Sequence, residues 1–294
     1  MFIVALTGDV GAGKSTFMSI LSEMGARTAS ADLIVKGLWG RREVRSAFIS
    51  RWGDVPTKPD GSIDAAAVSR RVFSDAEEYR FLCSVLHPLT WDALRSTVTD
   101  DGVWVLEVPL LFESEVPHWV DGTVYIRSPR DIRALRVAAR GWDDQELPAR
   151  ERWLLDADVK SRMADWVLDN GGTLEDLEAA ARELYGELKL LSSVLLGNLT
   201  FGSMGEAEEF ARVMVERRIA ACCRLTPVSS VYRWEGVVCH EGEVEVTFKT
   251  IEDRLVDLDE ILKSHSYDLP ALMLQRPYKM SLKLRRWVVE SCSP

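Results

Sequence analysis

The feature that most constrains this chain is the segment GDVGAGKS, from Gly8 to Ser15. It fits the pattern G-x-x-x-x-G-K-[ST], follows a β-rich apolar run at residues 2–7 and precedes a helical apolar periodicity over 14–24. Glycines let backbone N–H groups turn toward a polyphosphate, and the following helix N-terminus adds partial positive charge. We therefore predict a nucleoside triphosphate site, with Lys14 on the outer phosphates and the Ser15 hydroxyl on Mg²⁺.

Strand-like and helical segments alternate over the first two thirds of the chain. Apolar strands are predicted near residues 2–7, 28–31, 103–108, 123–126 and 166–168. A mostly helical stretch over 62–86 should end at His87-Pro88, and Ser128 should cap the helix that follows it. This alternation predicts an α/β fold with a central parallel sheet.

The pattern changes near residue 194. A strand over 195–200, a helix over 206–219, two long strands over 221–234 and 237–250, a helix over 251–264, a strand over 271–275 and a helix over 280–289 follow. This order is the ferredoxin-like α+β unit. We therefore predict two domains, residues 1–194 and 195–294.

Composition excludes several classes of partner. The net charge is −10, without the basic excess that binding to a nucleic acid or an anionic membrane needs. There is no uncharged apolar run of about 18 residues, so no membrane-spanning helix is expected and a cytoplasmic location is predicted. The five cysteines include no C-x-x-C pair, which argues against disulfides and structural zinc and favours small buried side chains.

Asp32 is the candidate general base. It follows the second predicted strand, and ligands of α/β sheets lie at the carboxyl ends of strands. Asp32 should therefore lie beside the phosphate loop, where a carboxylate can take a hydroxyl proton. The alternative is that Asp32 merely caps a helix.

Residues 1–194 resemble the dephospho-CoA kinase family. The resemblance depends on several segments in the family's order, namely IVALTG with GAGKST, Ala31-Asp32, His87-Pro88-Leu89, VPLLFE from Val108 to Glu113, Arg136 with Arg140, and ADWVLDN from Ala164 to Asn170. It implies a nucleoside-monophosphate-kinase-like fold with a mobile lid. It also implies ATP-dependent phosphorylation of the ribose 3′-hydroxyl of dephospho-CoA, a step of coenzyme A biosynthesis.

The resemblance also implies residue roles. Asp32 would be the base, and Lys14, Arg136 and Arg140 would stabilise the transferring phosphoryl group. His87 and Leu110 would join Asp32 in binding the acceptor, although a histidine before a proline also suits a structural cap. ATP would be bound by Gly8, Gly11, Ala12, Gly13, Lys14, Ser15, Thr16 and, near the adenine, Asn170.

Other positions in this part are predicted to do less. Arg130 and Arg133 are predicted to lie on a solvated basic face, Arg150 is a weaker lid candidate, and Glu113 is predicted to order its loop as a hydrogen-bond acceptor. Three residues depart from the family pattern, Asp9 (usually Gly), Ser30 (usually Asp) and Leu154 (usually Gln). Asp9 would place a negative charge near the phosphates.

Residues 195–294 resemble the CutA divalent-cation tolerance family. The resemblance depends on four short segments and three single residues. These are IAAC (219–222), SVYRWEG (230–236), EVE (243–245), FKT (248–250), and His265 with Tyr267 and Pro270. It implies a ferredoxin-like trimer that assembles through strand edges. Trp234, at the tip of the predicted hairpin, is a candidate interface anchor. His265 matches a metal-site histidine, but the family's cysteine and glutamate fall at Leu199 and Ala271, so an assembly module is favoured over a metal site.

Two alternatives to the kinase interpretation stay open. One alternative is a P-loop kinase for another nucleotide or nucleoside. The other is a nonenzymatic ATP-sensing or metal-binding trimer. Asp32 distinguishes the last alternative, because a sensor has no need of a base beside the γ-phosphate.

Overall fold

The chain forms two units in the computed structural model, which describes residues 1–72, 75–142 and 145–293. One unit is Phe2–Tyr185, and the other is Gly186–Pro294 together with Met1. The division falls within helix α9, Leu174–Ser192. The domain limits 1–194 and 195–294 stay a proposal. No helix in the described part of the chain has the length and apolar composition needed to cross a membrane.

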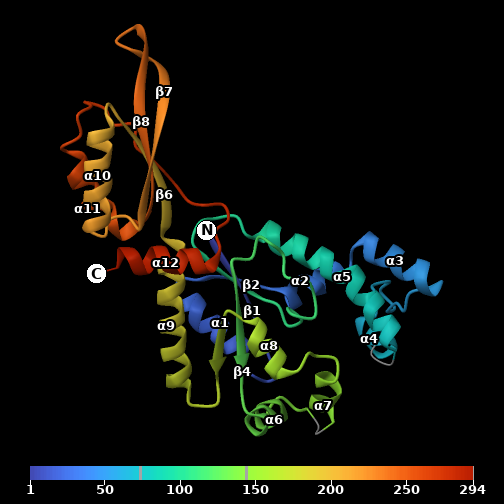
Figure 1. Cartoon of the computed structure of the whole chain (residues 1–294). Coiled ribbons are helices and arrows are strands. Elements are labelled where there is room, and N and C mark those ends of the chain that lie inside the picture. The colour runs from blue at the N-terminus through green and yellow to red at the C-terminus, as the bar shows by residue number, and fades with distance from the viewer. Residues whose placement is uncertain (73–74, 143–144, 294) are drawn as a thin grey trace. The chain divides into compact units, whose positions relative to one another are not determined.

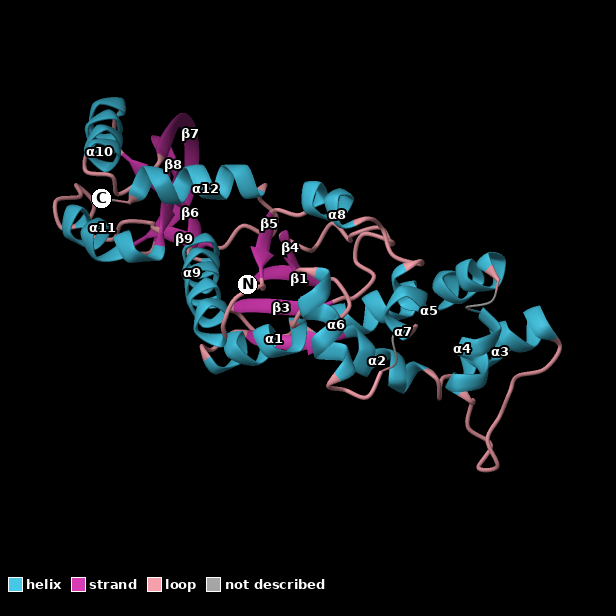
Figure 2. Ribbon diagram, turned by 90° about the horizontal axis from the view of Figure 1, so that it is seen from below, coloured by secondary structure: helices cyan, strands magenta, loops and turns pink. Residues whose placement is uncertain are grey.

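The first unit is built on a parallel sheet with strand order β2-β3-β1-β4-β5 (Figure 2). Its strands are β1 (Phe2–Gly8), β2 (Arg27–Ser30), β3 (Val103–Glu107), β4 (Gly122–Arg127) and β5 (Trp166–Asp169). Every residue of β1 is buried, as expected of a strand with neighbours on both sides and both faces covered. This confirms the predicted α/β class and places the glycine loop at the end of the middle strand.

Helices complete this unit (Figure 1). They are α1 (Lys14–Glu23), α2 (Ala31–Leu38), α3 (Arg42–Trp52), α4 (Ala65–Val72), α5 (Ala76–Thr97), α6 (Arg130–Ala138), α7 (Glu146–Glu151), α8 (Ala157–Met163) and the start of α9. Helices α2 to α5 share an apolar cluster centred on Phe48, whose ring lies 4.7 Å from that of Trp52.

The predicted helix end at His87-Pro88 is wrong. Helix α5 continues through Pro88 to Thr97. Its buried side chains, Leu86, Thr90 and Leu94, recur at four-residue intervals and form one stripe against the rest of the unit. Burial of this stripe outweighs the one helical hydrogen bond that a proline removes.

The second unit is an antiparallel sheet with order β7-β8-β6-β9. Its elements are β6 (Val194–Phe201), α10 (Met204–Glu216), β7 (Cys222–Trp234), β8 (Val237–Ile251), α11 (Leu255–Leu262), β9 (Met273–Gln275) and α12 (Leu282–Cys292). This order confirms the ferredoxin-like prediction. The helix expected from Ile251 starts later, because buried Ile251 still pairs with Val194 at the end of β8 and a 3₁₀ turn, Glu252–Arg254, follows.

The two faces of this sheet are covered unequally. Helices α10 and α11 bury one face around Leu199, Val246 and Phe210. On the other face α12 covers only one end, around Val194 and Val288. The cysteines are free thiols, of which Cys292 is buried and the other four are partly buried.

Strands β7 and β8 continue as a long hairpin (Figure 1). Its turn is Glu235-Gly236, and both residues have positive φ, 46° and 83°. Two consecutive left-handed residues match the twist of a two-residue hairpin turn. The outer part exposes apolar side chains, namely Val231, Trp234, Val237 and Val238.

Candidate active site

The glycine loop connects the end of β1 to the start of α1. Gly11 and Gly13 have φ angles of 78° and 93°, in a backbone region that residues other than glycine rarely adopt. A Cβ atom on Gly13 would also lie 2.3 Å from Asn170 Nδ2. Asn170 in turn donates from Nδ2 to the Ala12 carbonyl at 2.8 Å. The glycines are therefore required for backbone shape and for close packing against Asn170.

Lys14 lies folded over this loop. Its Nζ donates to the Gly8 carbonyl at 2.9 Å and to the Asp9 carbonyl at 3.0 Å. Burial lowers the pKa of Lys14, and three nearby carboxylates oppose that shift, those of Glu107, Asp9 and Asp32. The ammonium group is therefore held at the loop, where it can meet the phosphates of a nucleotide.

Asp32 lies in the first turn of α2. The cap position of that helix is Ser30, so the structure does not place Asp32 as a helix cap. Its side chain is exposed and accepts no hydrogen bond from any residue the structure describes, while its charge acts on Lys14. The charge of Asp32 therefore reaches the loop lysine, and its role as the base for an acceptor hydroxyl stays a prediction.

Arg136 contacts the residues that support the loop. Its Nη1 donates to the Asn170 carbonyl at 3.1 Å and to Ser128 Oγ at 3.2 Å. Ser128 does not cap α6 as predicted, because Pro129 holds the cap position and the Ser128 hydroxyl donates to the Asn170 carbonyl at 2.7 Å. Arg140 follows the end of α6 and is exposed, and among the described residues no hydrogen bond joins it to the loop.

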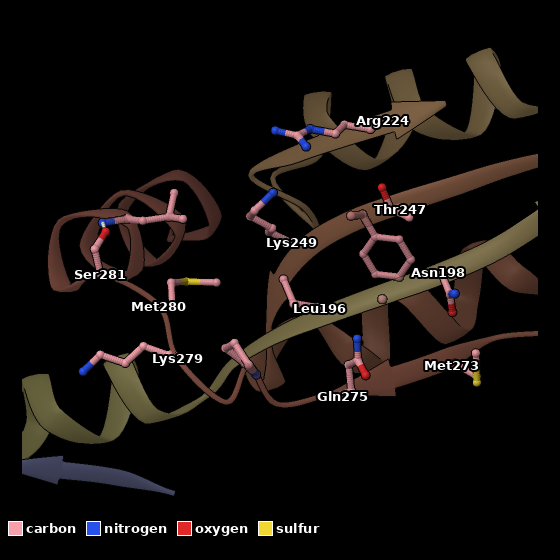
Figure 3. Close-up of a pocket in the computed structure, with 14 residues that line it drawn as sticks. Leu196, Asn198, Arg224, Thr247, Lys249, Met273, Gln275, Lys279, Met280 and Ser281 are labelled. Carbon is pink, nitrogen blue, oxygen red and sulfur yellow. Dashed lines mark hydrogen bonds between the residues drawn. The ribbon is translucent and has the colours of Figure 1, made fainter. Parts of the chain in front are cut away.

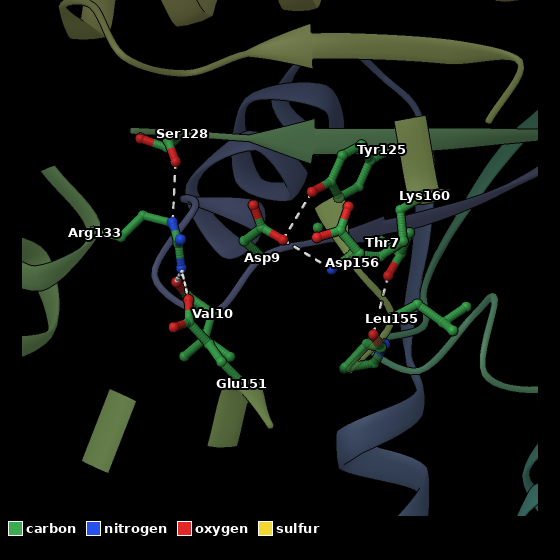
Figure 4. Close-up of polar contacts among 12 residues, drawn as sticks. Thr7, Asp9, Val10, Tyr125, Ser128, Arg133, Glu151, Leu155, Asp156 and Lys160 are labelled. Carbon is green, nitrogen blue, oxygen red and sulfur yellow. Dashed lines mark hydrogen bonds and ion pairs between the residues drawn. The ribbon is translucent and has the colours of Figure 1, made fainter. Parts of the chain in front are cut away.

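The predicted solvated position of Arg133 is wrong. Arg133 is only 8% exposed, and its guanidinium donates to the carbonyls of Ser128 and Val10 at 3.0 and 3.2 Å (Figure 4). It also pairs with Glu151 of α7, as Arg130 does more distantly at 3.8 Å. The spacing of the arginines along their own helix could not reveal the burial of Arg133, because its partner, Glu151, belongs to another helix.

Asp9 forms a buried ion pair that sequence reasoning missed. One carboxylate oxygen, Oδ1, accepts from Lys160 Nζ at 2.8 Å and from the Tyr125 hydroxyl at 2.8 Å (Figure 4). Burial and the bond to Asp9 raise the pKa of the Tyr125 phenol. Lys160 thus balances the negative charge that Asp9 brings to the loop. Asp9 itself was the sequence signal for this ion pair, because an acid that is buried in the folded protein requires a cationic partner.

Of the predicted acceptor-side residues, His87 lies near the Glu113 carboxylate. Burial lowers the pKa of His87, and the Glu113 carboxylate opposes that shift. Glu113 Oε1 accepts from the Leu155 backbone N–H at 2.9 Å, so this side chain does connect two loops. Leu110 lies in the turn after β3, next to Pro109, whose carbonyl accepts from the Thr7 hydroxyl at 3.0 Å.

His265 of the second unit uses both ring nitrogens. Nδ1 accepts from the Tyr267 backbone N–H at 3.0 Å, so Nε2 carries the proton and donates to the Thr200 carbonyl at 3.1 Å. Among the described residues, no group of three or more His, Cys, Asp or Glu side chains is placed to hold a metal ion. The metal role of His265 stays a prediction.

Known proteins match the two parts separately. Residues 2–176 match the family model for dephospho-CoA kinase, and residues 196–291 match that for the CutA1 divalent ion tolerance protein. Dephospho-CoA kinase of Thermus thermophilus is 34% identical over 189 residues, covering 63% of this chain and 91% of that protein.

Solved structures are similar to one part of the chain or the other. The crystal structure of TT1252 from Thermus thermophilus has a TM-score of 0.55 and 33% identity, covering 64% of this chain and 97% of that one. CutA from Synechococcus elongatus is 36% identical, with a TM-score of 0.33, and covers 34% of this chain and 90% of that one. The chain therefore belongs to the dephospho-CoA kinase family, and its residues 196–291 match the CutA1 family model.

Proposed function

We propose that this chain uses ATP to phosphorylate the ribose 3′-hydroxyl of dephospho-CoA, giving coenzyme A. The observation that carries the proposal is that Lys14 is held on the glycine loop, while the exposed Asp32 carboxylate in the first turn of α2 is near enough for its charge to act on that lysine. A phosphoryl transfer needs two groups in the same site. One is a cation at the donor phosphates, and the other is a base for the acceptor hydroxyl. We expect this reaction to take place in the cytoplasm.

On the donor side, the loop from Gly8 to Thr16 holds the phosphates of ATP. The ammonium of Lys14 leaves the loop carbonyls for the β- and γ-phosphates. Arg136 supplies positive charge to the transferring group from its position beside Asn170, and Arg140 joins it from the end of α6. Asn170 lies against the loop and contacts the adenine side of the nucleotide.

The protein's own oxygen donors suit Mg²⁺. The Ser15 hydroxyl is exposed in the first turn of α1, and the carboxylates of Asp32 and Glu107 act on the neighbouring Lys14. Hydroxyl, carboxylate and phosphate oxygens are the ligands that Mg²⁺ prefers. Ser15 would hold the ion with ATP, where it would neutralise charge on the β- and γ-phosphates.

On the acceptor side, Asp32 takes the proton of the 3′-hydroxyl as its oxygen bonds to the γ-phosphorus of ATP and the bond from that phosphorus to the β,γ-bridging oxygen breaks, which releases ADP. His87 and Leu110 contact the remainder of dephospho-CoA. Neutral His87 suits this role, because burial disfavours its charged form.

A panel of acceptors tests the proposal. The full chain is given Mg-ATP with dephospho-CoA, adenosine, or other nucleosides and nucleotides, and ADP release is followed. Turnover with dephospho-CoA well above the others is expected. Preference for another acceptor favours a different P-loop kinase, and ATP binding without any transfer favours a sensor.

The C-terminal unit is proposed to form a homotrimer. Strand β7 is an edge of the sheet, and its hairpin exposes Val231 and Trp234. An unpaired edge with apolar side chains favours addition of a strand from another copy. Light scattering on the full chain and on Trp234→Lys with Val231→Lys tests this, since the variant should have the smaller mass. A wild-type monomer would contradict the proposal.

A further inference from the structure

Cationic side chains gather in two cavities of the described chain. The first, of about 510 Å³, lies on the antiparallel sheet and includes Arg224 of β7, the edge strand of the proposed trimer contact, so its surroundings belong to that assembly (Figure 3). The second, of about 710 Å³, is lined only by the first unit, Phe2–Tyr185, which is called the kinase unit from here on. This volume lies within the range of about 300–1,000 Å³ that is usual for small-molecule sites.

The cavity of the kinase unit is strongly basic. Five cationic side chains line it, namely Lys36, Arg41, Arg42, Arg45 and Lys58, against a single carboxylate, that of Asp60. Among the described residues none of the five forms an ion pair, and Asp60 Oδ1 accepts from the N–H and the hydroxyl of Ser62, at 2.9 and 2.6 Å. Unbalanced cations in one cavity repel each other, and an anionic ligand removes that repulsion.

The cations of this cavity are carried on a fixed frame. Trp39 and Ile63, which also line the cavity, pack in the apolar cluster around Phe48. The Lys58 N–H donates to the Ser62 carbonyl at 2.8 Å and so closes a turn over residues 58–62. Arg45 Nη1 donates to the carbonyl of Gly61 within that turn, at 3.1 Å. The cavity is therefore formed before a ligand arrives, which reduces the entropy that binding costs.

Lys36 connects this cavity to the candidate base. Asp32 and Lys36 are four residues apart in α2, and both are exposed. Residues at this spacing project from the same face of a helix, with Cβ atoms about 5–6 Å apart. Helix α2 leads from the sheet toward α3 and α4, where the other cations lie (Figure 2). The helix surface is open along the way, because Leu33 is 66% exposed and a Cβ atom on Gly37 would meet nothing within 4 Å.

The proposed acceptor carries its groups in the same order. Dephospho-CoA has its 3′-hydroxyl and its 5′-diphosphate on two sides of one ribose, and a neutral pantetheine arm follows the diphosphate. A ribose spans about one turn of a helix, which is about 5.4 Å. With the hydroxyl at Asp32, the diphosphate therefore lies within reach of Lys36. A cation is needed there, because the acceptor diphosphate is otherwise repelled by Asp32 and by the phosphates of ATP.

We propose that Lys36 and the cations of this cavity bind the diphosphate of the acceptor and thereby select dephospho-CoA over a free nucleoside. The inference rests on the proposed function, because it places the 3′-hydroxyl of the acceptor at Asp32. Lys36 donates to the diphosphate directly. Arg41 and Arg42, which follow α2, add positive potential that holds the diphosphate at this end of the helix.

Steady-state kinetics of the full chain with Mg-ATP test this role of Lys36. The KM for dephospho-CoA should rise about tenfold in Lys36→Gln, the effect of losing one charge-assisted hydrogen bond, while the KM for ATP stays unchanged. Lys36→Arg keeps the charge and should keep the KM close to that of wild type. Added salt should raise the KM for dephospho-CoA more steeply in wild type than in Lys36→Gln. Arg182→Gln is the matched control, because that exposed arginine of α9 pairs with Glu178 and does not line the cavity.

Calorimetric titration adds a measurement that needs no turnover. Dephospho-CoA is titrated into the full chain saturated with Mg²⁺ and a non-hydrolysable ATP analogue, and its affinity should fall about tenfold in Lys36→Gln. Adenosine, which lacks the diphosphate, should bind both proteins equally. The inference is overturned if wild type phosphorylates dephospho-CoA but Lys36→Gln leaves its KM and affinity unchanged. Binding of dephospho-CoA that depends on Lys36, without transfer to the 3′-hydroxyl, would support the inference and contradict the proposed function.

Discussion

The ammonium group of Lys160 lies 2.8 Å from the Asp9 carboxylate, although 151 residues separate the two in the chain. Both side chains are largely buried, with exposures of 4% and 11%. The pair explains how a phosphate loop tolerates an acid at its second position, since the charge is balanced before any nucleotide arrives. It also attaches α8 to the loop, which gives the pair a measurable effect on stability.

Lys160→Met should therefore destabilise the kinase unit. The substitution keeps the side-chain length but leaves a buried carboxylate without its cation, a change that typically costs about 3–5 kcal/mol of the free energy of unfolding. Urea denaturation followed by circular dichroism measures this cost. Adding Asp9→Asn to Lys160→Met should recover a large part of it, and equal stability of Lys160→Met and wild type would disprove the coupling.

Asp32→Asn should separate base catalysis from binding. Turnover should fall by roughly 10²–10⁴, the usual contribution of a positioned general base. ATP affinity should hardly change, because the glycine loop and Lys14 hold the phosphates. Turnover, ATP affinity at several Mg²⁺ concentrations and the melting temperature are measured together.

The outcomes of this variant distinguish three roles for Asp32. Reduced ATP affinity that extra Mg²⁺ restores would assign Asp32 to ordering the ion instead. Near-normal turnover with a small loss of stability would leave Asp32 only a structural part of α2. Glu43→Gln, at an exposed acid in the first turn of α3, is the control and should leave all three quantities unchanged.

Gly13→Ala should abolish ATP binding. The added Cβ atom would lie 2.3 Å from Asn170 Nδ2, and the backbone there has a φ of 93°. Either Asn170 or the loop has to move, and the loop then loses the shape that presents its N–H groups. Equilibrium binding of a fluorescent ATP analogue measures the loss.

Gly37→Ala is the matched control for this substitution. Gly37 lies within α2, and a Cβ atom there meets nothing within 4 Å. Alanine in place of a helical glycine should raise the free energy of unfolding by up to about 1 kcal/mol. ATP binding that survives Gly13→Ala as well as it survives Gly37→Ala would show that the loop does not need this glycine.

His87 should make stability depend on pH. Burial lowers its pKa in the folded state, with Glu113 opposing, so the unfolded chain binds protons more readily. The contribution of neutral His87 is therefore complete above the unfolded pKa of about 6.5 and is lost as the pH falls through the folded pKa. Free energies of unfolding from about pH 8 to pH 5 should decline less steeply in His87→Gln than in wild type. The exposed His118→Gln should follow wild type, and identical slopes for all three proteins would refute the prediction.

Local patterns predicted the elements that depend on neighbouring residues. The buried strand, the glycine loop and the helix that follows it form one continuous segment, so their order alone located the loop. Asp32 was predicted for the same reason, because it directly follows a strand end of the same sheet. Its catalytic role stays a prediction.

Contacts between distant residues were not predictable in this way. Pro88 indicated a helix end, but the buried stripe through Leu86 and Leu94 holds α5 together across it. Arg133 had the spacing of a surface arginine, and its burial depends on Glu151 of another helix. No spacing rule connects Asp9 with Lys160.

The proline within α5 has a consequence for the surface around it. A helical residue normally bonds its N–H to the carbonyl four positions earlier, and Pro88 has no N–H to offer the carbonyl of Ser84. Ser84, His87 and Pro88 line one cavity of about 430 Å³. The interruption that sequence rules treat as a helix breaker thus leaves the wall of that cavity with one fewer helical hydrogen bond than an uninterrupted helix would have.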